Sequence, residues 1–161
     1  MIDAGNLRFY LSGGESNSDP RKSTGGPRSK TQVGAGLFPN VTSQQALMGV
    51  VQYRCVYFVN EDPSQDGFME PARLWLREVP DGGQKIEIAV DVSGRNGAAS
   101  EKPSEKLQFK SPRAREAAAL LPETPYHTGD HVAIWIRRTI PPKCEPSKKS
   151  GFDLVVEGDS I

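Results

Sequence analysis

The 161 residues are enough for one domain with a core and too few for two full ones. Apolar residues make up 36%, and 16 glycines with 13 prolines predict a modest core and many turns. The 20 basic and 20 acidic residues cancel, which does not favour nucleic acid or a membrane surface as a partner. There is no membrane-length apolar run and no basic-then-apolar secretion signal, so we expect synthesis in a cytoplasm-like compartment.

Residues 1–49 form the first predicted unit, an extended N-terminal arm. Apolar residues are sparse, and one short strand is predicted over residues 7–11. Glycine and proline recur between residues 13 and 27 and interrupt both helix and strand. A segment of this length without a core is either disordered or ordered by a partner. Residues 41–48 favour a helical turn with Thr42 or Ser43 as its N-cap.

Residues 50–161 form the second predicted unit, a β-sandwich domain. Apolar and polar residues alternate with a period of two in five segments, which predicts strands over 51–59, 73–79, 86–92, 131–138 and 152–156. The first of these carries apolar residues on both faces and is expected to be central. The turn signal at residues 80–83 favours a hairpin between the second and third.

Three shorter features complete the predicted domain. Residues 107–109 favour a short strand, and Pro141 and Pro142 end the fourth strand or place it at an edge. One helix is predicted over residues 111–121, with Ser111 as N-cap and a proline after its end. Because strands do not alternate with helices, the expected fold is all-β: an antiparallel sandwich, Ig-like or jelly-roll-like.

The sequence contains no recognisable catalytic pattern. His127 and His131 have helical spacing, but a Thr-Gly-Asp turn separates them, and no H-E-x-x-H, G-x-S-x-G or phosphate-loop motif occurs. We therefore predict no catalytic, metal or cofactor residues and no enzyme activity. Cys55 lies in a strand pattern as a buried thiol, while a Cys55–Cys144 disulfide stays open.

Several arginines fall on predicted strands close to a tryptophan. They are Arg54, Arg73, Arg137 and Arg138, with Trp135 beside the last two. One hypothesis is an outward basic face, and the alternative is a solvated face with scattered ion pairs. The neutral total charge favours the second.

Three stretches together resemble small structural proteins of tailed bacteriophages. They are Leu11-Ser12-Gly13-Gly14 with Asp19-Pro20 and Gly25-Gly26, then residues 53–60 and 72–76, and finally residues 129–141 and 152–159. The resemblance spans most of the chain in the same order. The Ala-rich stretch after Pro112 and the basic loop at residues 143–149 depart from the pattern, which leaves the position within the virion open.

The resemblance implies a virion component, made in the host bacterial cytoplasm. The first hypothesis is a capsid decoration (cement) or minor head protein that binds the major capsid protein or other virion proteins as a homo-oligomer, without direct contact with nucleic acid or membrane. Strand addition by the arm suits such contacts, and its expected contact residues are Arg8, Phe9, Tyr10, Arg21, Arg28, Leu37 and Phe38. Deleting the arm is expected to leave the domain folded and abolish assembly.

Two alternatives stay open at this point. One is a structural module of the tail, neck or baseplate, which shares the same sequence features. The other is a carbohydrate- or receptor-binding sandwich that uses Trp75, Trp135 and the tyrosines, although the apolar neighbours of both tryptophans favour burial in the core.

Overall fold

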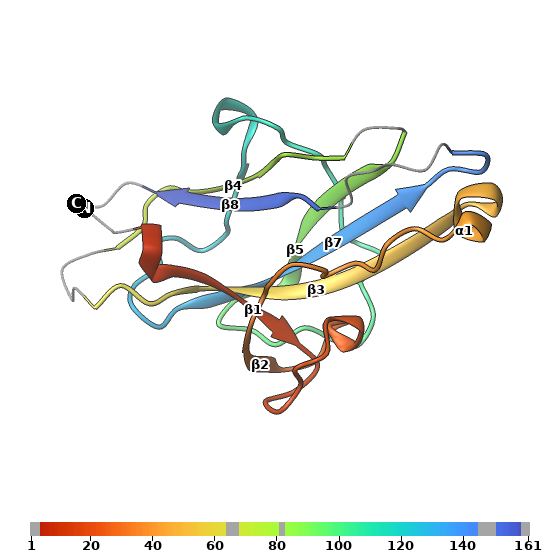
Figure 1. The fold of residues 1–161 in the computed structure, drawn as a ribbon. Coiled ribbons are helices and arrows are strands. Elements are labelled where there is room, and N and C mark those ends of the chain that lie inside the picture. Colours follow the sequence, from red (N-terminus) through yellow and green to blue (C-terminus); the bar gives the residue numbers. More distant parts are fainter. Residues whose placement is uncertain (1–3, 64–67, 81–82, 145–150, 159–161) are drawn as a thin grey trace.

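Two antiparallel sheets face each other in the computed structural model, which describes residues 4–63, 68–80, 83–144 and 151–158 (Figure 1). The larger sheet has the strand order β2 (Arg28–Gln32), β1 (Leu7–Ser12), β3 (Val50–Asn60), β7 (His131–Ile140), β5 (Lys85–Arg95). The smaller sheet has the order β6 (Ala119–Leu120), β4 (Ala72–Arg77), β8 (Asp153–Gly158). The predicted all-β antiparallel sandwich is confirmed.

The two longest-paired strands, β3 and β7, form the centre of the larger sheet. Their register runs from Val50↔Ile140 to Val59↔His131. Because successive side chains of a strand point to opposite faces, β3 contributes to two separate apolar clusters. The prediction of a central strand is confirmed, and β7 ends at Ile140, so Pro141 stops this strand and does not mark a sheet edge.

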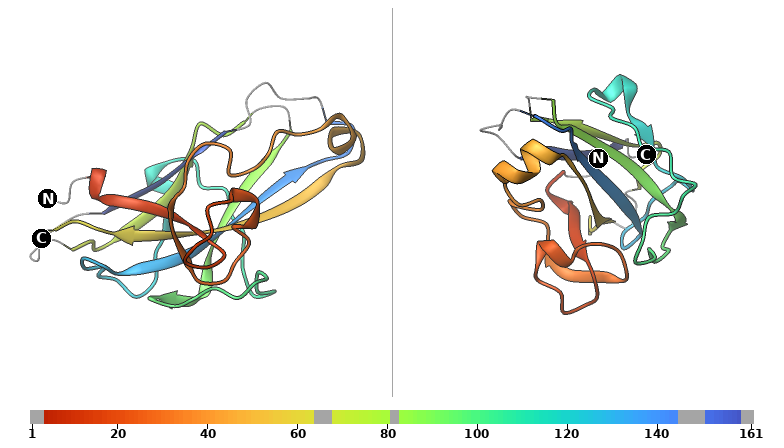
Figure 2. Two further views of the ribbon diagram at one scale, coloured as in Figure 1. Left: turned by 60° about the horizontal axis from the view of Figure 1, so that its bottom comes forward. Right: turned by 90° about the vertical axis from the view of Figure 1, so that its right-hand side faces the viewer.

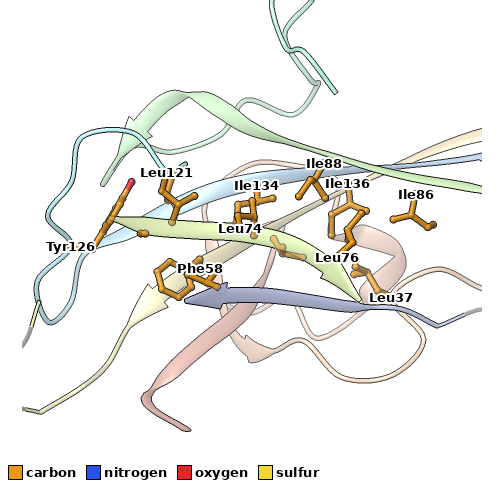
Figure 3. Packing of buried hydrophobic residues seen from close by; sticks show 14 of the residues in the cluster. Leu37, Phe58, Leu74, Leu76, Ile86, Ile88, Leu121, Tyr126, Ile134 and Ile136 are labelled. Carbon is orange, nitrogen blue, oxygen red and sulfur yellow. The ribbon is translucent and has the colours of Figure 1, made fainter. Parts of the chain in front are cut away.

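The main core lies between the two sheets. Leu74 and Leu76 of β4 face Ile134 and Ile136 of β7, with Phe58 of β3 beside them (Figure 3). All five side chains are almost completely buried. Full burial of such a side chain is worth about 1.5–3 kcal/mol, so this cluster supplies the main favourable term that holds the small sheet on the large one.

The outer face of the larger sheet is covered by loops. Cys55, Tyr57 and Trp135 point to this side and are buried. The Tyr57 hydroxyl donates to the carbonyl of Gly26 at 2.6 Å and accepts from the N–H of Ala99 at 2.9 Å, which ties two loops together over the sheet.

Close backbone approach in this loop layer requires a glycine at position 25. Gly25 has φ +108°, and a Cβ there would lie 2.1 Å from the carbonyl oxygen of Ser100. An L-residue is strained at this φ and would also collide with backbone.

The N-terminal residues are part of the sandwich, and the predicted extended arm is wrong. β1 pairs with β3 from Leu7↔Asn60 to Leu11↔Val56, and β2 pairs with β1. Figure 2 shows this red-to-orange segment lying against the larger sheet. Leu37 and Phe38 belong to the main core. The apolar residues of this segment are few, but their partners lie far along the chain, so local composition hides their burial.

The predicted helix over residues 111–121 is also wrong. The segment holds a 3₁₀ turn (Arg115–Ala117) and the short strand β6. The backbone of this segment forms hydrogen bonds with β4. The N–H of Leu76 donates to the carbonyl of Pro112, and the N–H of Leu121 donates to the carbonyl of Ala72. Pairing with a neighbouring strand has overridden a favourable local helix pattern.

Among the described residues the one α-helix is α1 (Ser43–Met48), where the helical turn was predicted. Thr42 is its N-cap and forms a capping box with Gln45. No helix in the described ranges is long and apolar enough to cross a membrane.

Two further strand predictions fail. β4 pairs with β6 and β8, whereas β5 pairs with β7 in the other sheet, so the expected hairpin does not form. Two residues of its predicted turn, 81–82, lie outside the described residues. Residues 107–109 form no strand, and only an isolated bridge joins Lys110 to Ile88.

Candidate binding groove and buried arginine pair

A groove of about 1040 Å³ opens between β8 and the β1 side of the larger sheet. Its walls are mainly apolar, with charged side chains at the mouth. The apolar lining comprises Leu7, Phe9, Val33, Leu37, Phe38, Val56, Ile136, Phe152 and Leu154. The charged residues are Arg8, Arg77, Glu78 and Asp153. Concave, largely apolar sites with a few polar groups are the usual form of binding sites.

One wall of the groove is the edge strand β8. In the sheet order β6-β4-β8, no described strand pairs with the outer side of β8. The direction of its free backbone groups follows from β4. The carbonyl of Ala72 and the N–H of Leu76 both bond toward the β6 side, to Leu121 and Pro112.

The backbone N–H and carbonyl groups of successive residues in a strand point alternately to its two sides. Because those of Leu76 point toward β6, those of the preceding residue, Trp75, point toward β8. Trp75 is in register with Val155, whose backbone therefore bonds inward to β4. Leu154 and Val156 consequently turn their N–H and carbonyl groups to the open edge. This edge is a template for another extended segment.

Four of the seven predicted contact residues line this groove: Arg8, Phe9, Leu37 and Phe38. Arg8 is ion-paired with Glu61 at 3.1 Å. The structure thus brings these four together, but as parts of the folded domain. Leu37 and Phe38 are 8% and 4% exposed, so they are core residues and not free contacts of an arm.

The other three predicted contact residues lie away from the groove lining. The Arg28 guanidinium lies 5.3 Å from the centre of the Tyr10 ring, and the Tyr10 hydroxyl donates to Glu61. The exposed Arg21 lies beside Asp19 in a 3₁₀ turn. These residues do not form one surface with the groove.

The outward basic face, the less favoured of the two hypotheses, does not form, because two of its arginines point into the sandwich. Arg54 and Arg138 are 8% and 0% exposed. Arg54 is in register with the core residue Ile136, and Arg138 with Gln52. Arg137 points to the other face, where Glu87 pairs with it at 3.0 Å, as the alternative of scattered ion pairs predicted.

Neutral groups hold both buried guanidiniums. Arg54 Nε donates to the carbonyl of Leu37 at 3.1 Å, and its Nη1 donates to the carbonyl of Tyr53 at 2.9 Å. Arg138 Nε donates to Gln52 Oε1 at 2.9 Å, and its Nη2 bonds to the same oxygen. The Phe38 ring centre lies 5.1 Å from the Arg54 guanidinium carbon and 4.9 Å from that of Arg138.

The electrostatic setting of this pair is unfavourable to charge. Burial, followed by the nearby Arg54 charge, lowers the pKa of Arg138 to about 10. Burial also lowers the pKa of Arg54, which the charge of Asp19 partly offsets. Arg138 Nη1 is buried without a hydrogen-bond partner. Sequence reasoning missed this pair, although both arginines share strand parity with core residues.

The cysteines and histidines do not gather into a site in the parts of the chain that the structure describes. No disulfide joins Cys55 to Cys144, and Cys55 is buried as predicted. His127 and His131 flank a turn, as expected, and no group of three potential metal ligands occurs among the described residues.

The tryptophans are buried as predicted. Trp135 is fully buried, and its Nε1 donates to Asp91 at 2.8 Å. Trp75 is 9% exposed. Neither ring is open for stacking on a sugar.

No protein-family model, curated protein or solved structure matches this chain. The groove and the arginine pair are therefore interpreted from their own geometry and chemistry.

Proposed function

We propose that the protein is a structural component of a tailed-bacteriophage particle, where it serves as a capsid decoration or minor head protein. In this role it binds a neighbouring virion protein in the groove beside β8. The observation that carries the binding role is the free edge of β8 above an apolar groove. The assignment to a virion rests on the sequence resemblance described above.

Strand addition is the binding mode that this geometry favours. An extended segment aligned with β8 can bond to the outward backbone groups of Leu154 and Val156. Its alternate side chains then enter the groove and meet Phe9, Phe38 and Phe152. Each apolar side chain buried there is worth about 1.5–3 kcal/mol.

The charges around the groove favour a partner without strong net charge. Arg77 is 3.4 Å from Asp153, and Arg8 is paired with Glu61. Because these charges are already paired, the selectivity must come from shape and from backbone bonding. In a symmetric shell, weak contacts of this kind are repeated and their affinities combine.

Two substitutions at one position test the binding mode. Leu154→Pro removes the outward N–H but leaves the inward bonds of Val155 in place, whereas Leu154→Ala removes the same side chain and keeps the N–H. The two variants are supplied separately to particles assembled without the natural protein, and quantitative mass spectrometry measures the amount of each variant in the particles. We expect the alanine variant to be incorporated, and the proline variant to be present in an amount at least tenfold lower. Equal incorporation of the two folded variants would rule out strand addition at β8.

Location is tested by antibody labelling of intact particles of the source phage. Label spread over the head at high copy supports the decoration role. Label confined to the neck, tail or baseplate moves the same interface to the tail alternative. Absence of the protein from particles, confirmed by mass spectrometry, contradicts the virion proposal.

A further inference from the structure

We propose that the buried Arg54–Arg138 pair is a binding site for one oxyanion, either a carboxylate or a phosphate group. This site is separate from the strand-addition edge, and the proposal does not depend on the virion role. Its basis is two interior guanidiniums with neutral partners only and one unsatisfied, fully buried donor.

The charge balance of the interior requires a counter-charge. An arginine does not lose its proton at neutral pH, so both groups stay cationic in the folded protein. A buried charge without an opposite charge is costly, and two like charges side by side add their repulsion. Among the described residues, neither guanidinium has a carboxylate within ion-pair distance.

The hydrogen-bonding geometry leaves donors for an anion. The bonds to neutral groups use Nε and Nη1 of Arg54, and Nε and Nη2 of Arg138. Arg54 Nη2 takes no part in these bonds, and Arg138 Nη1 has no partner. Two guanidiniums on adjacent strands therefore offer one unused nitrogen each. An oxyanion with two or more oxygens can accept from both.

The groove provides the approach. Phe38 lies over both guanidiniums and also lines the groove, as does Ile136, the register partner of Arg54. One aromatic ring thus separates the groove from the arginines. That ring is itself in contact with Phe152, with a centroid distance of 6.2 Å.

The test is saturable stabilisation by an oxyanion. The full chain is unfolded thermally in 0–20 mM inorganic phosphate, and separately in acetate, with chloride keeping the ionic strength constant. A ligand that binds only the folded state raises Tm in proportion to log(1 + [L]/Kd). Titration calorimetry on the unmodified protein should give one site per chain and does not require any variant to fold.

Two variants assign the effect to the pair. Arg138→Met keeps the apolar stem and removes the charge, and it should weaken oxyanion binding at least tenfold. In chloride alone its Tm should be equal to or above that of the natural protein, because an uncompensated buried charge is gone. Arg28→Gln, at an exposed arginine, is the matched control and should bind normally.

Each outcome decides the proposal. Saturation by phosphate alone assigns a phosphate group, saturation by acetate alone assigns a carboxylate, and saturation by both assigns the shared oxyanion chemistry. No saturable effect of either probe overturns the proposal. A Tm rise that persists unchanged in Arg138→Met also overturns it, because general salt exclusion or another site then explains it.

Discussion

At the scale of single residues, strand parity decides what each side chain can do. Arg137 and Arg138 are neighbours in sequence, yet Arg137 pairs with Glu87 while Arg138 is fully buried beside Gln52. The positions of charged residues in the sequence do not distinguish the ion-paired environment of Arg137 from the buried environment of Arg138. The alternation of β7, once its register with β3 is known, separates them completely.

Protonation of His131 should make the free energy of unfolding depend on pH. Burial and the nearby Arg28 charge lower the pKa of this imidazole below its ordinary 6.5, against an opposing effect of Asp130. The Tyr57 ring packs against it at 5.6 Å. The folded state thus favours the neutral form, so stability is full above pH 6.5 and declines as the pH falls below it.

Substitution of His131 by Phe should remove this part of the decline while keeping the ring contact with Tyr57. Chemical denaturation between pH 7.5 and 5 measures it through the free energy of unfolding at each pH. His127→Gln, at an exposed histidine, is the control. An unchanged slope in His131→Phe would assign the acid sensitivity of this range to other groups.

Thiol chemistry should differ between the two cysteines. Burial raises the pKa of Cys55, and its side chain is inaccessible, so the reactive thiolate does not form in the folded protein. Cys144 is partly exposed. Titration with a disulfide reagent should modify one thiol in buffer and two in denaturant, and Cys144→Ser should abolish the fast reaction. Rapid modification of native Cys144→Ser would show that Cys55 is accessible.

At the scale of elements, neighbouring strands decide whether a local pattern is realised. Residues 43–48 form α1 because the capping box of Thr42 and Gln45 satisfies the first turn within the segment itself. Residues 111–121 have better helical composition, but their backbone pairs along β4. The difference is the presence of an adjacent strand with unsatisfied groups.

Removal of the α1 cap should have a small, local cost. Thr42 Oγ1 accepts from the N–H of Gln45 at 3.1 Å. Thr42→Ala should lower the free energy of unfolding by about 1 kcal/mol. Thr42→Ser keeps the capping hydroxyl and should therefore retain most of the stabilisation that the cap provides. Urea denaturation measures both variants. A loss that is equal in the two would assign the effect to the Thr methyl group instead of the cap.

At the scale of the whole molecule, the N-terminal third completes the larger sheet. β1 is the neighbour of β3 on the side opposite β7, and Leu11 contributes to the main core. The organisation into an arm and a separate domain is thereby replaced by one folded unit over the described residues.

Deletion of residues 1–49 should therefore abolish cooperative unfolding of the remainder. The deletion removes β1, β2 and the buried Leu11, Leu37 and Phe38. Loss of one such side chain typically costs 2–5 kcal/mol, against a total stability of about 5–15 kcal/mol. Calorimetry and near-UV circular dichroism measure the result.

A milder change provides the graded comparison for this deletion. Leu11→Ala should stay folded and lose about 2–5 kcal/mol. If residues 50–161 alone unfold cooperatively near the temperature of the full chain, the N-terminal residues are dispensable for the fold, contrary to this expectation.

The sequence by itself determined the segments of β1, β3, β4, β5, β7 and β8, the all-β class and the burial of Cys55 and both tryptophans. These features follow from local alternation of apolar residues, which needs no knowledge of distant partners. It also placed α1, because the capping box runs only from Thr42 to Gln45 and needs no distant partner.

Only the tertiary structure decided which strands pair and where the groove and arginine pair lie. β4 and β5 are close in sequence but lie in different sheets, and β1 meets β3 across some fifty residues. Such pairing depends on the summed burial of both faces of a strand, which no local window contains. For the same reason, Arg54 and Arg138 meet only after β3 and β7 are aligned.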